Sequence, residues 1–358
     1  QSDKPPRGVF REDLLQARAI RDGKSHREAN DGALIPVGNG ILPVLYEFPG
    51  KIQQPAKLPG EQAPREDVRL WSMVLPNAGR SITVKRLEEE YENARAKGIQ
   101  ELARWASQHL NVEIGLALRS DRWVGADFWL SAGDPDLTME ALIDRSDVIV
   151  AGIDGGGLDD LLSLAVLGRD RITQEWMHWG KNWVFEGILE LRKREASQLK
   201  DFETQGDLII VSTPGDDIEQ LADVLETVDM SGKLALVGLD PMGVGAVVDA
   251  LAVRGISSPR VVGVSQGWTL SGAITTAERK LADGTLVHGA RPIMGWAISN
   301  AKVEPRGNAI IITKQAAGYL KIDPLMALLN AVTLMSKNPS PPEGGRIDVS
   351  LKGGMLSA

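Results

Sequence analysis

Three aspartates, Asp154, Asp240 and Asp323, lie where separate parts of the chain could bring carboxylates together. Asp154 ends the apolar run that begins at Val148, and Asp240 follows the apolar run 234–239. Runs of this kind, rich in β-branched and aliphatic residues, are typical of strands buried on both faces. Asp323 opens a third apolar stretch. Each acid is therefore predicted at the end of a strand or at the beginning of a helix.

Carboxylates that meet without a cation repel one another and raise one another's pKa values. Mg²⁺ and Mn²⁺ prefer oxygen ligands and relieve this repulsion. Two such ions about 4 Å apart can activate a water molecule and stabilise the leaving oxygen of a phosphodiester. If the three aspartates converge, they predict two-metal-ion hydrolysis of a phosphodiester. Three acids chosen from 48 acidic residues do not by themselves establish that convergence.

Two of these acids also have a purely structural interpretation. Asp154 precedes the glycines 155–157, and a turn after a strand often uses an aspartate because its short side chain tolerates turn geometry. Asp323 followed by Pro324 has the pattern of a helix N-cap with proline at the first helical position. On the sequence alone, both interpretations stay open.

The elements around these acids alternate between strand and helix. Strands are predicted over residues 148–154, 161–167, 176–185, 208–212, 234–239, 260–264 and 309–313, and helices over 187–200, 216–228, 244–254, 271–282, 292–300 and 323–335. The first two strands read as a hairpin, and the alternation that follows implies parallel strands with crossover helices. In such a sheet, ligands bind at strand ends near a chain reversal.

The first third of the chain has a different character. Helices are predicted over residues 11–20 and 85–110, a strand over 41–48 and a loop over 49–66. Thr83 can cap the second helical stretch, and Lys97-Gly98 should break it into two helices. We predict a helical or irregular segment over residues 1–130, a linker over 131–146, the main α/β domain over 147–337 and a mobile tail over 338–358.

The composition bounds the class of protein. The 358 residues suffice for two domains, and 43% hydrophobic with 25% charged residues is ordinary for a soluble globular protein. No apolar run reaches about 18 residues, so no membrane span is predicted. The chain has no cysteine and four scattered histidines, which argues against thiolate or histidine-rich metal sites. It begins with Gln1 rather than Met, so we expect a fragment or a processed product.

Charge and loop motifs narrow the functions further. The net charge of −8 argues against a surface coated with Lys and Arg for nonspecific nucleic-acid binding. It does not exclude a carboxylate site, because bound metal ions would cancel the negative charge there. A phosphate-binding loop of the form GxxxxGK[ST] is absent, because Ser231-Gly232-Lys233 is followed by Leu234. Gly243 and Gly245 lack the third glycine of a dinucleotide motif. Independent ATP hydrolysis is therefore not expected.

The order of several short motifs resembles the large subunit of tailed-bacteriophage terminases. The motifs are LWSMVLPNAGRSIT, IDGGGLDDLLSLAVLG, VGLDPMG, ARPIMGWAISNAKV and KIDPLMALLNAV, and the resemblance covers approximately residues 70–336. It implies a ribonuclease H-like α/β fold, a mixed sheet flanked by helices, preceded by a smaller and mainly helical end of an ATPase part. The ATPase's catalytic motifs have no counterpart in this sequence.

The resemblance also implies roles for individual residues. Asp154, Asp240 and Asp323 match the family's catalytic, metal-binding acids, and Asp160 matches a second acid of the first motif; its structural alternative is a turn or helix-start acid.

Other matched positions are predicted near DNA. Asn300, with Trp296, matches a WxxxN element whose role is either structural or DNA-proximal. Lys314 and Lys321 could face phosphates, although a solvated lysine is the simpler interpretation.

The leading hypothesis is therefore a Mg²⁺- or Mn²⁺-dependent endonuclease that cuts concatemeric double-stranded phage DNA during packaging, with two bound ions. Its implied partners are DNA, the terminase small subunit and the portal or procapsid, in the host bacterial cytoplasm. The alternatives are a nucleotide-binding α/β enzyme, suggested by VGLDPMGVG, and a noncatalytic fragment that docks to packaging partners. Thermal stability with added divalent cations would separate them, because specific binding stabilises a fold by mass action.

Overall fold

A computed structural model describes residues 8–21, 26–28, 34–36, 44–49, 66–111, 122–241, 245–314 and 321–340. The chain forms two compact units. The first comprises Gln1–Arg122 with Lys193–Ser197, and the second comprises Trp123–Arg192 with Gln198–Ala358. None of the helices in the described ranges is long and apolar enough to cross a membrane.

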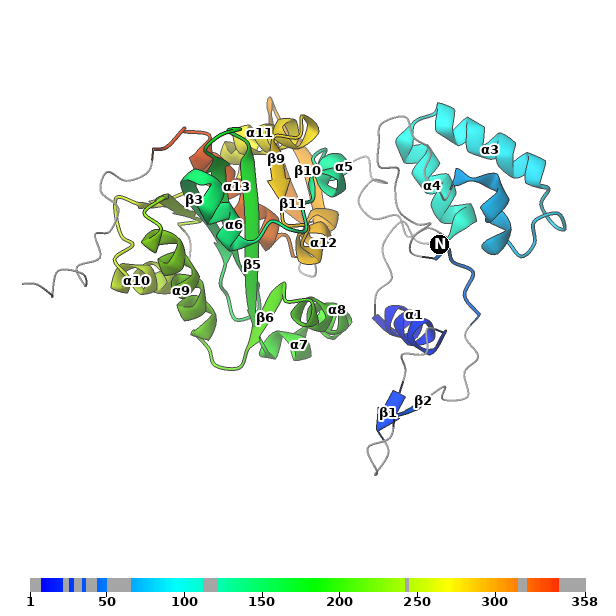
Figure 1. The fold of residues 1–358 in the computed structure, drawn as a ribbon, viewed down its shortest axis with the longest axis horizontal. Coiled ribbons are helices and arrows are strands. Elements are labelled where there is room, and N and C mark those ends of the chain that lie inside the picture. Colours follow the sequence, from blue (N-terminus) through cyan, green and yellow to red (C-terminus); the bar gives the residue numbers. More distant parts are fainter. Residues whose placement is uncertain are drawn as a thin grey trace, which may run out of the picture. The chain divides into compact units, whose positions relative to one another are not determined.

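The second unit is built on a mixed sheet of seven strands within the described residues (Figure 1). The strands are β3 (Ser146–Gly155), β4 (Leu162–Asp170), β5 (Trp176–Phe185), β6 (Leu208–Val211), β7 (Leu234–Leu239), β8 (Val261–Gly263) and β9 (Leu286–His288). Their order is β6-β5-β4-β3-β7-β8, with β9 also paired to β5. Strands β3, β4 and β5 pair antiparallel, whereas β6, β7, β8 and β9 join in parallel. The predicted mixed α/β fold is confirmed.

The register of β3 places Asp154 and Asp240 at the C-terminal ends of two neighbouring parallel strands, β3 and β7. In the hairpin, Asp154 lies opposite Ser163 on β4, and an irregularity between Ser146 and Val148 marks a β-bulge at the start of β3. On its other side β3 runs parallel to β7, with Ile153 beside Leu239. Because parallel strands end at the same edge, the residues that follow this pair, Asp154 and Asp240, emerge side by side.

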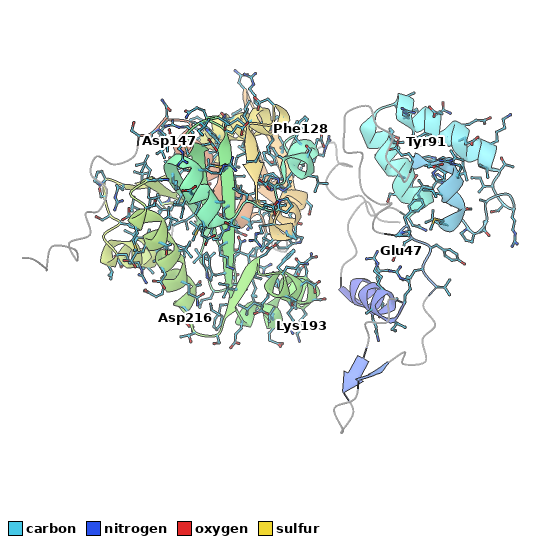
Figure 2. The ribbon with its side chains drawn as sticks, viewed as in Figure 1. Glu47, Tyr91, Phe128, Asp147, Lys193 and Asp216 are labelled. Atoms are coloured by element: carbon cyan, nitrogen blue, oxygen red, sulfur yellow. The ribbon has the colours of Figure 1, made fainter. Side chains whose placement is uncertain are left out.

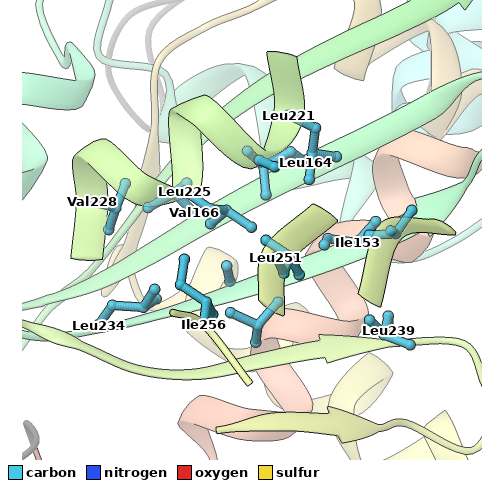
Figure 3. Packing of buried hydrophobic residues seen from close by; sticks show 14 of the residues in the cluster. Ile153, Leu164, Val166, Leu221, Leu225, Val228, Leu234, Leu239, Leu251 and Ile256 are labelled. Atoms are coloured by element: carbon cyan, nitrogen blue, oxygen red, sulfur yellow. The ribbon is translucent and has the colours of Figure 1, made fainter. Parts of the chain in front are cut away.

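Alternate residues of β3 face opposite layers of helices. Ile149, Ala151 and Ile153 belong to the main hydrophobic cluster, together with Leu225 of α9 (Asp216–Met230) and Leu251 of α10 (Gly245–Val253). Figure 3 shows this layer, in which the helix side chains pack onto the strands. The start of α9 at Asp216 is labelled among the side chains of Figure 2.

The opposite face of β3 carries Asp154 and is covered by α13 (Asp323–Met335). The helix lies so close to the strand that a Cβ atom added to Gly152 would stand 2.0 Å from the Ala327 carbonyl oxygen and 2.5 Å from the Ala331 nitrogen. Helices α11 (Ser271–Ala282) and α12 (Pro292–Asn300) pack against α13. Since β3 continues past Gly152 to Asp154 on the same face, the strand end and α13 are fixed against each other.

Most predicted elements from residue 148 onward are confirmed, with three exceptions. Residues 187–200 form two helices, α7 (Gly187–Leu191) and α8 (Lys193–Thr204), because Arg192 has non-helical dihedral angles of φ −120° and ψ 53°. Strand β9 was not predicted and has only three residues. Strand β10 (Ala301–Arg306), which pairs with β11 (Ala309–Lys314), also lacks a prediction and contains a proline.

The segment 131–146, predicted as a linker, is largely structured. The short helices α5 (Ala126–Trp129) and η4 (Leu130–Ala132) lead into it, and it contains α6 (Met139–Arg145). Thr138 caps α6 by accepting a hydrogen bond from the Ala141 amide, and Leu142 is fully buried in the main cluster. This segment is therefore part of the second unit's core. Of the predicted tail, residues 341–358 lie outside the described residues.

The first unit is mainly helical. Its elements are α1 (Gly8–Arg21), β1 (His26–Glu28), β2 (Leu34–Pro36), η2 (Val68–Met73), α3 (Val84–Ala96) and α4 (Ile99–Leu110). Thr83 caps α3 as predicted, with its hydroxyl oxygen 3.3 Å from the Arg86 nitrogen, and the predicted break falls at Gly98, whose φ is +107°. Trp71, Tyr91 and Trp105 form an aromatic core.

Two predictions in the first unit cannot be followed in full. Residues 44–48 of the predicted strand 41–48 have no regular secondary structure, although Phe48 is buried in the unit's hydrophobic cluster. Residues 41–43 and most of the predicted loop 49–66 lie outside the described residues.

Candidate metal centre

Asp323 lies at the beginning of α13 without acting as its N-cap. Ile322 occupies the cap position with no side-chain cap hydrogen bond, so the predicted capping role of Asp323 is wrong. The residue is only 3% exposed, and its Oδ2 atom has no hydrogen-bond partner among the residues that the structure describes. A buried carboxylate oxygen without a partner costs free energy, because nothing in the fold replaces its hydration. Its position therefore fits a ligand-binding role better than a purely structural one.

The four predicted acids lie close enough to influence one another electrostatically. Burial raises the pKa of Asp154 well above its usual value, and the charges of Asp323, Asp160 and Asp240 raise it further. Burial also raises the pKa of Asp323 to about 6, with Asp160 adding to this effect. Like charges in one site disfavour ionisation in this way. The structure thus brings together acids from β3, the loop after it, the end of β7 and the start of α13.

Two lysines bring positive charge to the same place. The ammonium groups of Lys314 and Lys321 lower the pKa of Asp323, and Lys314 does the same for Asp154. Lys314 ends β11 and is exposed, whereas Lys321 is only 5% exposed. The Lys321 ammonium donates to a carboxylate oxygen of Asp160 and, at 3.0 Å, to the Asp159 carbonyl oxygen. Lys321 thus points into the group of acids.

Asn300 and Trp296 are parts of the packing around this site. Asn300 is fully buried, and its side-chain amide donates to the Lys321 carbonyl oxygen at 3.0 Å. Trp296 is 8% exposed and packs beside Phe202, with ring centroids 5.6 Å apart. For Asn300, the geometry supports the structural alternative, in which it holds the backbone that carries Lys321. The predicted DNA-proximal roles of Asn300, Lys314 and Lys321 stay predictions.

Sequence reasoning missed Ser163, which lies opposite Asp154 on β4. Side chains of a directly opposed pair share one face of the sheet, with Cβ atoms about 5 Å apart. Ser163 is fully buried, and no described residue forms a hydrogen bond with its hydroxyl oxygen. No sequence motif marks it, but its alternation with Leu162 and Leu164 in a predicted hairpin could have placed it beside Asp154.

A buried amide network fixes the end of β3, and it too was not predicted. Asn330 of α13 is fully buried, and its amide donates to the Ile153 carbonyl oxygen at 2.9 Å. Its side-chain oxygen accepts from the Gln266 amide at 2.9 Å, which also donates to the Val264 carbonyl oxygen. Hydrogen bonds thus connect α13, the segment around Gln266 and the end of β3 at Ile153, one residue before Asp154.

The donor set fits a hard divalent cation, although the side chains do not yet form a ligand cage. Carboxylate oxygens are the ligands that Mg²⁺ and Mn²⁺ prefer, and the unpartnered Asp323 oxygen is available to one. Among the residues that the structure describes, no three His, Cys, Asp or Glu side chains are arranged to hold a metal ion. One of the candidate carboxylates, that of Asp160, accepts a hydrogen bond from the Lys321 ammonium group.

Comparison with known proteins gives a match at the level of fold. The large terminase of bacteriophage HK97 is similar with a TM-score of 0.50 and 15% sequence identity, covering 92% of this chain and 61% of that one. This chain therefore spans less than two thirds of the length of the HK97 protein. No protein-family model and no curated protein matches the chain.

Two nuclease structures have lower scores. The large terminase nuclease of thermophilic phage G20c with bound magnesium has a TM-score of 0.37 and 14% identity, covering 60% of this chain and 98% of that one. The large terminase nuclease domain of bacteriophage SPP1 with bound Mn has a TM-score of 0.34 and 17% identity, covering 56% and 94%. These two scores fall below 0.5, whereas the HK97 match shows that this chain has a fold similar to the matched part of that protein.

Proposed function

We propose that this protein is a divalent-metal-dependent DNA endonuclease of a phage packaging terminase. The observation that carries the proposal is the buried, unpartnered Asp323 carboxylate oxygen among four mutually repelling aspartates at the edge of the sheet. Such an arrangement is unfavourable in the fold unless a cation occupies it. The fold of a phage large terminase supports the choice of DNA as the substrate.

In this function, Asp154, Asp240 and Asp323 would hold Mg²⁺ or Mn²⁺, and Asp160 would contribute once it leaves Lys321. The metal would supply an activated water for attack on the phosphorus and stabilisation of the leaving oxygen. The carboxyl groups of Asp154 and Asp323 would favour binding of the metal ion. The pKa values of Asp154 and Asp323 are raised by burial, so a bound cation would favour the ionised forms of both carboxyl groups. Two ions are proposed, as the number of carboxylates permits.

The biological setting is proposed from the same resemblance. The substrate would be concatemeric double-stranded DNA, and the partners would be the terminase small subunit and the portal or procapsid in the host bacterial cytoplasm. Residues 147–337 would form the nuclease, and residues 1–130 the end of an ATPase part. Independent ATP hydrolysis is not expected, because the sequence has no phosphate-binding loop of the GxxxxGK[ST] form.

The test is cleavage of supercoiled plasmid by the full chain with Mn²⁺. We expect Asp240→Asn to reduce the cleavage rate about 100-fold or more, because a lost metal ligand removes several kcal/mol of transition-state stabilisation. The matched control is Asp249→Asn, at an exposed position on α10. Equal cleavage by wild type and Asp240→Asn would reject the assignment.

Two further outcomes would redirect the proposal. No cleavage, together with no Mn²⁺-dependent rise in melting temperature, would indicate a noncatalytic packaging fragment. Stabilisation by ATP or NAD rather than by Mn²⁺ would indicate a nucleotide-binding enzyme.

A further inference from the structure

Lys321 places a buried cation inside the group of acids. Its side chain is 6% exposed, and its ammonium donates to the Asp160 carboxylate and to the Asp159 carbonyl oxygen. Lysine is almost never buried to this extent unless it is paired, because the ammonium loses its hydration. The pair therefore gives Asp160 a counter-charge in the absence of any metal ion.

Both partners of this ion pair are anchored in the elements that carry the candidate ligands. The Lys321 carbonyl oxygen accepts from the buried Asn300 amide, and α13 begins with Asp323 two residues later. The Asp160 carboxylate also accepts from the Leu161 amide at 3.1 Å, just before β4 begins. The lysine is thus held at the site from its backbone and from its ammonium group.

We infer that Lys321 is a resident counter-cation that occupies Asp160 in the metal-free protein and that a divalent ion must displace it to recruit this carboxylate. The inference rests on the proposed function, since it assumes that the aspartates bind a metal ion. An ammonium and a divalent ion on one carboxylate repel each other, so the two compete. This competition also accounts for the absence of a ready ligand cage among the described residues.

Displacement would leave the ammonium group beside the bound ion, where a DNA phosphate would be its natural partner. Lys321 would then have two successive partners: Asp160 before the ion binds and a phosphate oxygen of the substrate afterwards. The exchange requires only rotation of the flexible lysine side chain, because Asn300 holds its backbone in place.

The first test is calorimetric titration of Mn²⁺ into the full chain and three variants. Lys321→Met should tighten Mn²⁺ binding about tenfold or more, because it removes a positive charge that competes for Asp160. Lys321→Arg keeps the charge and should not tighten binding. The matched control is Lys302→Met, which removes a lysine paired with Glu304 at 3.3 Å on β10.

The outcomes separate this inference from the proposed function. If wild type binds Mn²⁺ and Lys321→Met binds it no more tightly than Lys302→Met, the inference is overturned and the proposed function stands. If wild type binds no Mn²⁺, both are overturned.

A second measurement uses wild-type protein and does not depend on whether a variant folds. Amine-reactive labelling, read by mass spectrometry, should modify Lys321 slowly in metal-free protein and several-fold faster at saturating Ca²⁺, while Lys302 reacts equally in both. Unchanged or slower labelling of Lys321 with Ca²⁺ would overturn the displacement, whatever the affinities of the variants.

Discussion

Asp323 occupies a position that is electrostatically unfavourable for its ionised form. It is buried, its Oδ2 atom has no hydrogen-bond partner within the described part of the chain, and burial together with Asp160 raises its pKa to about 6. A group whose pKa is higher in the folded state than the ordinary 3.8 destabilises the fold once the pH is high enough to ionise it. The metal-free protein should therefore lose stability at this residue as the pH rises from about 4 through 6.

The first prediction follows at this scale. Asp323→Asn should raise the free energy of unfolding at pH 7.5 in EDTA by about 1 kcal/mol or more, because it removes a buried charge. It should also abolish the stabilisation by Mn²⁺. Urea denaturation measures both effects, with Asp249→Asn as the control for a neutralised exposed aspartate. The gain should vanish below pH 4, where Asp323 is protonated in both states; a gain that persists there would contradict this explanation.

The positions of the acids could be predicted from the sequence, whereas their hydrogen-bond partners could not. Asp154 and Asp240 could be placed because each follows a buried apolar run, and a strand end is visible in sequence. The pairing of Lys321 with Asp160 joins residues 161 positions apart, so no local pattern encodes it. The same holds for Asn330 and Ile153, 177 positions apart.

At the scale of elements, the contact between α13 and β3 determines whether the acids converge. The helix backbone approaches Gly152 so closely that no Cβ atom fits between them. Two residues further along the same face of the strand stands Asp154, while Asp323 begins the helix. The close approach therefore serves the site as well as the core.

The second prediction tests this contact. Gly152→Ala should destabilise the protein by about 3 kcal/mol or more, because backbone atoms of α13 cannot yield as a flexible side chain would. Metal binding should weaken in parallel, since Asp323 moves with the helix. Gly272→Ala is the matched control: it lies in α11 with nothing within 4 Å of the added Cβ, and we expect it to be neutral or stabilising by up to about 1 kcal/mol.

Thermal unfolding and Mn²⁺ titration of both variants provide the measurement. Equal stability of Gly152→Ala and Gly272→Ala would mean that α13 can shift without cost. It would contradict the prediction that the close contact between α13 and β3 positions Asp323.

Long periodic elements were predictable, and short or irregular ones were not. The β3–β4 hairpin, β5 and β7 have apolar runs bounded by turn residues. Their local sequence preference therefore matches the strand structure that they adopt in the fold. Strand β9 has three residues and pairs with β5 only in the folded sheet. Helix α6 was hidden by the turn formers that precede it, although Thr138 and the buried Leu142 were available as signals.

At the scale of the whole molecule, stability depends on two neutral histidines in the sheet. His178 and His288 are paired on β5 and β9, and burial lowers their pKa values to about 3 and about 4. His288 accepts from the Ala290 amide at Nδ1, so its Nε2 carries the proton that is donated to the Trp129 carbonyl oxygen at 2.7 Å. Neither ring nitrogen of His178 has a hydrogen-bond partner in the described ranges of the chain.

The third prediction is a pH dependence of the fold. Because these pKa values are lowered from 6.5, the unfolded chain binds protons that the folded chain does not, and stability falls as the pH falls below 6.5. The loss should reach about 1.4 kcal/mol per pH unit for each histidine. Replacing His178 by Phe should make the dependence between pH 6.5 and 4.5 shallower by one proton, as measured by urea denaturation. His109→Gln, in the first unit, is the control, and a slope unchanged by His178→Phe would contradict the prediction.

The alternation of faces along β3 has a consequence for how this protein can change. Substitutions on the strand alter packing by degrees, whereas loss of one residue between positions 149 and 153 would rotate Asp154 onto the side of α9 and α10, among aliphatic side chains. The number of residues from position 149 to position 153, rather than the identity of any one of them, thus determines on which face of the sheet Asp154 lies.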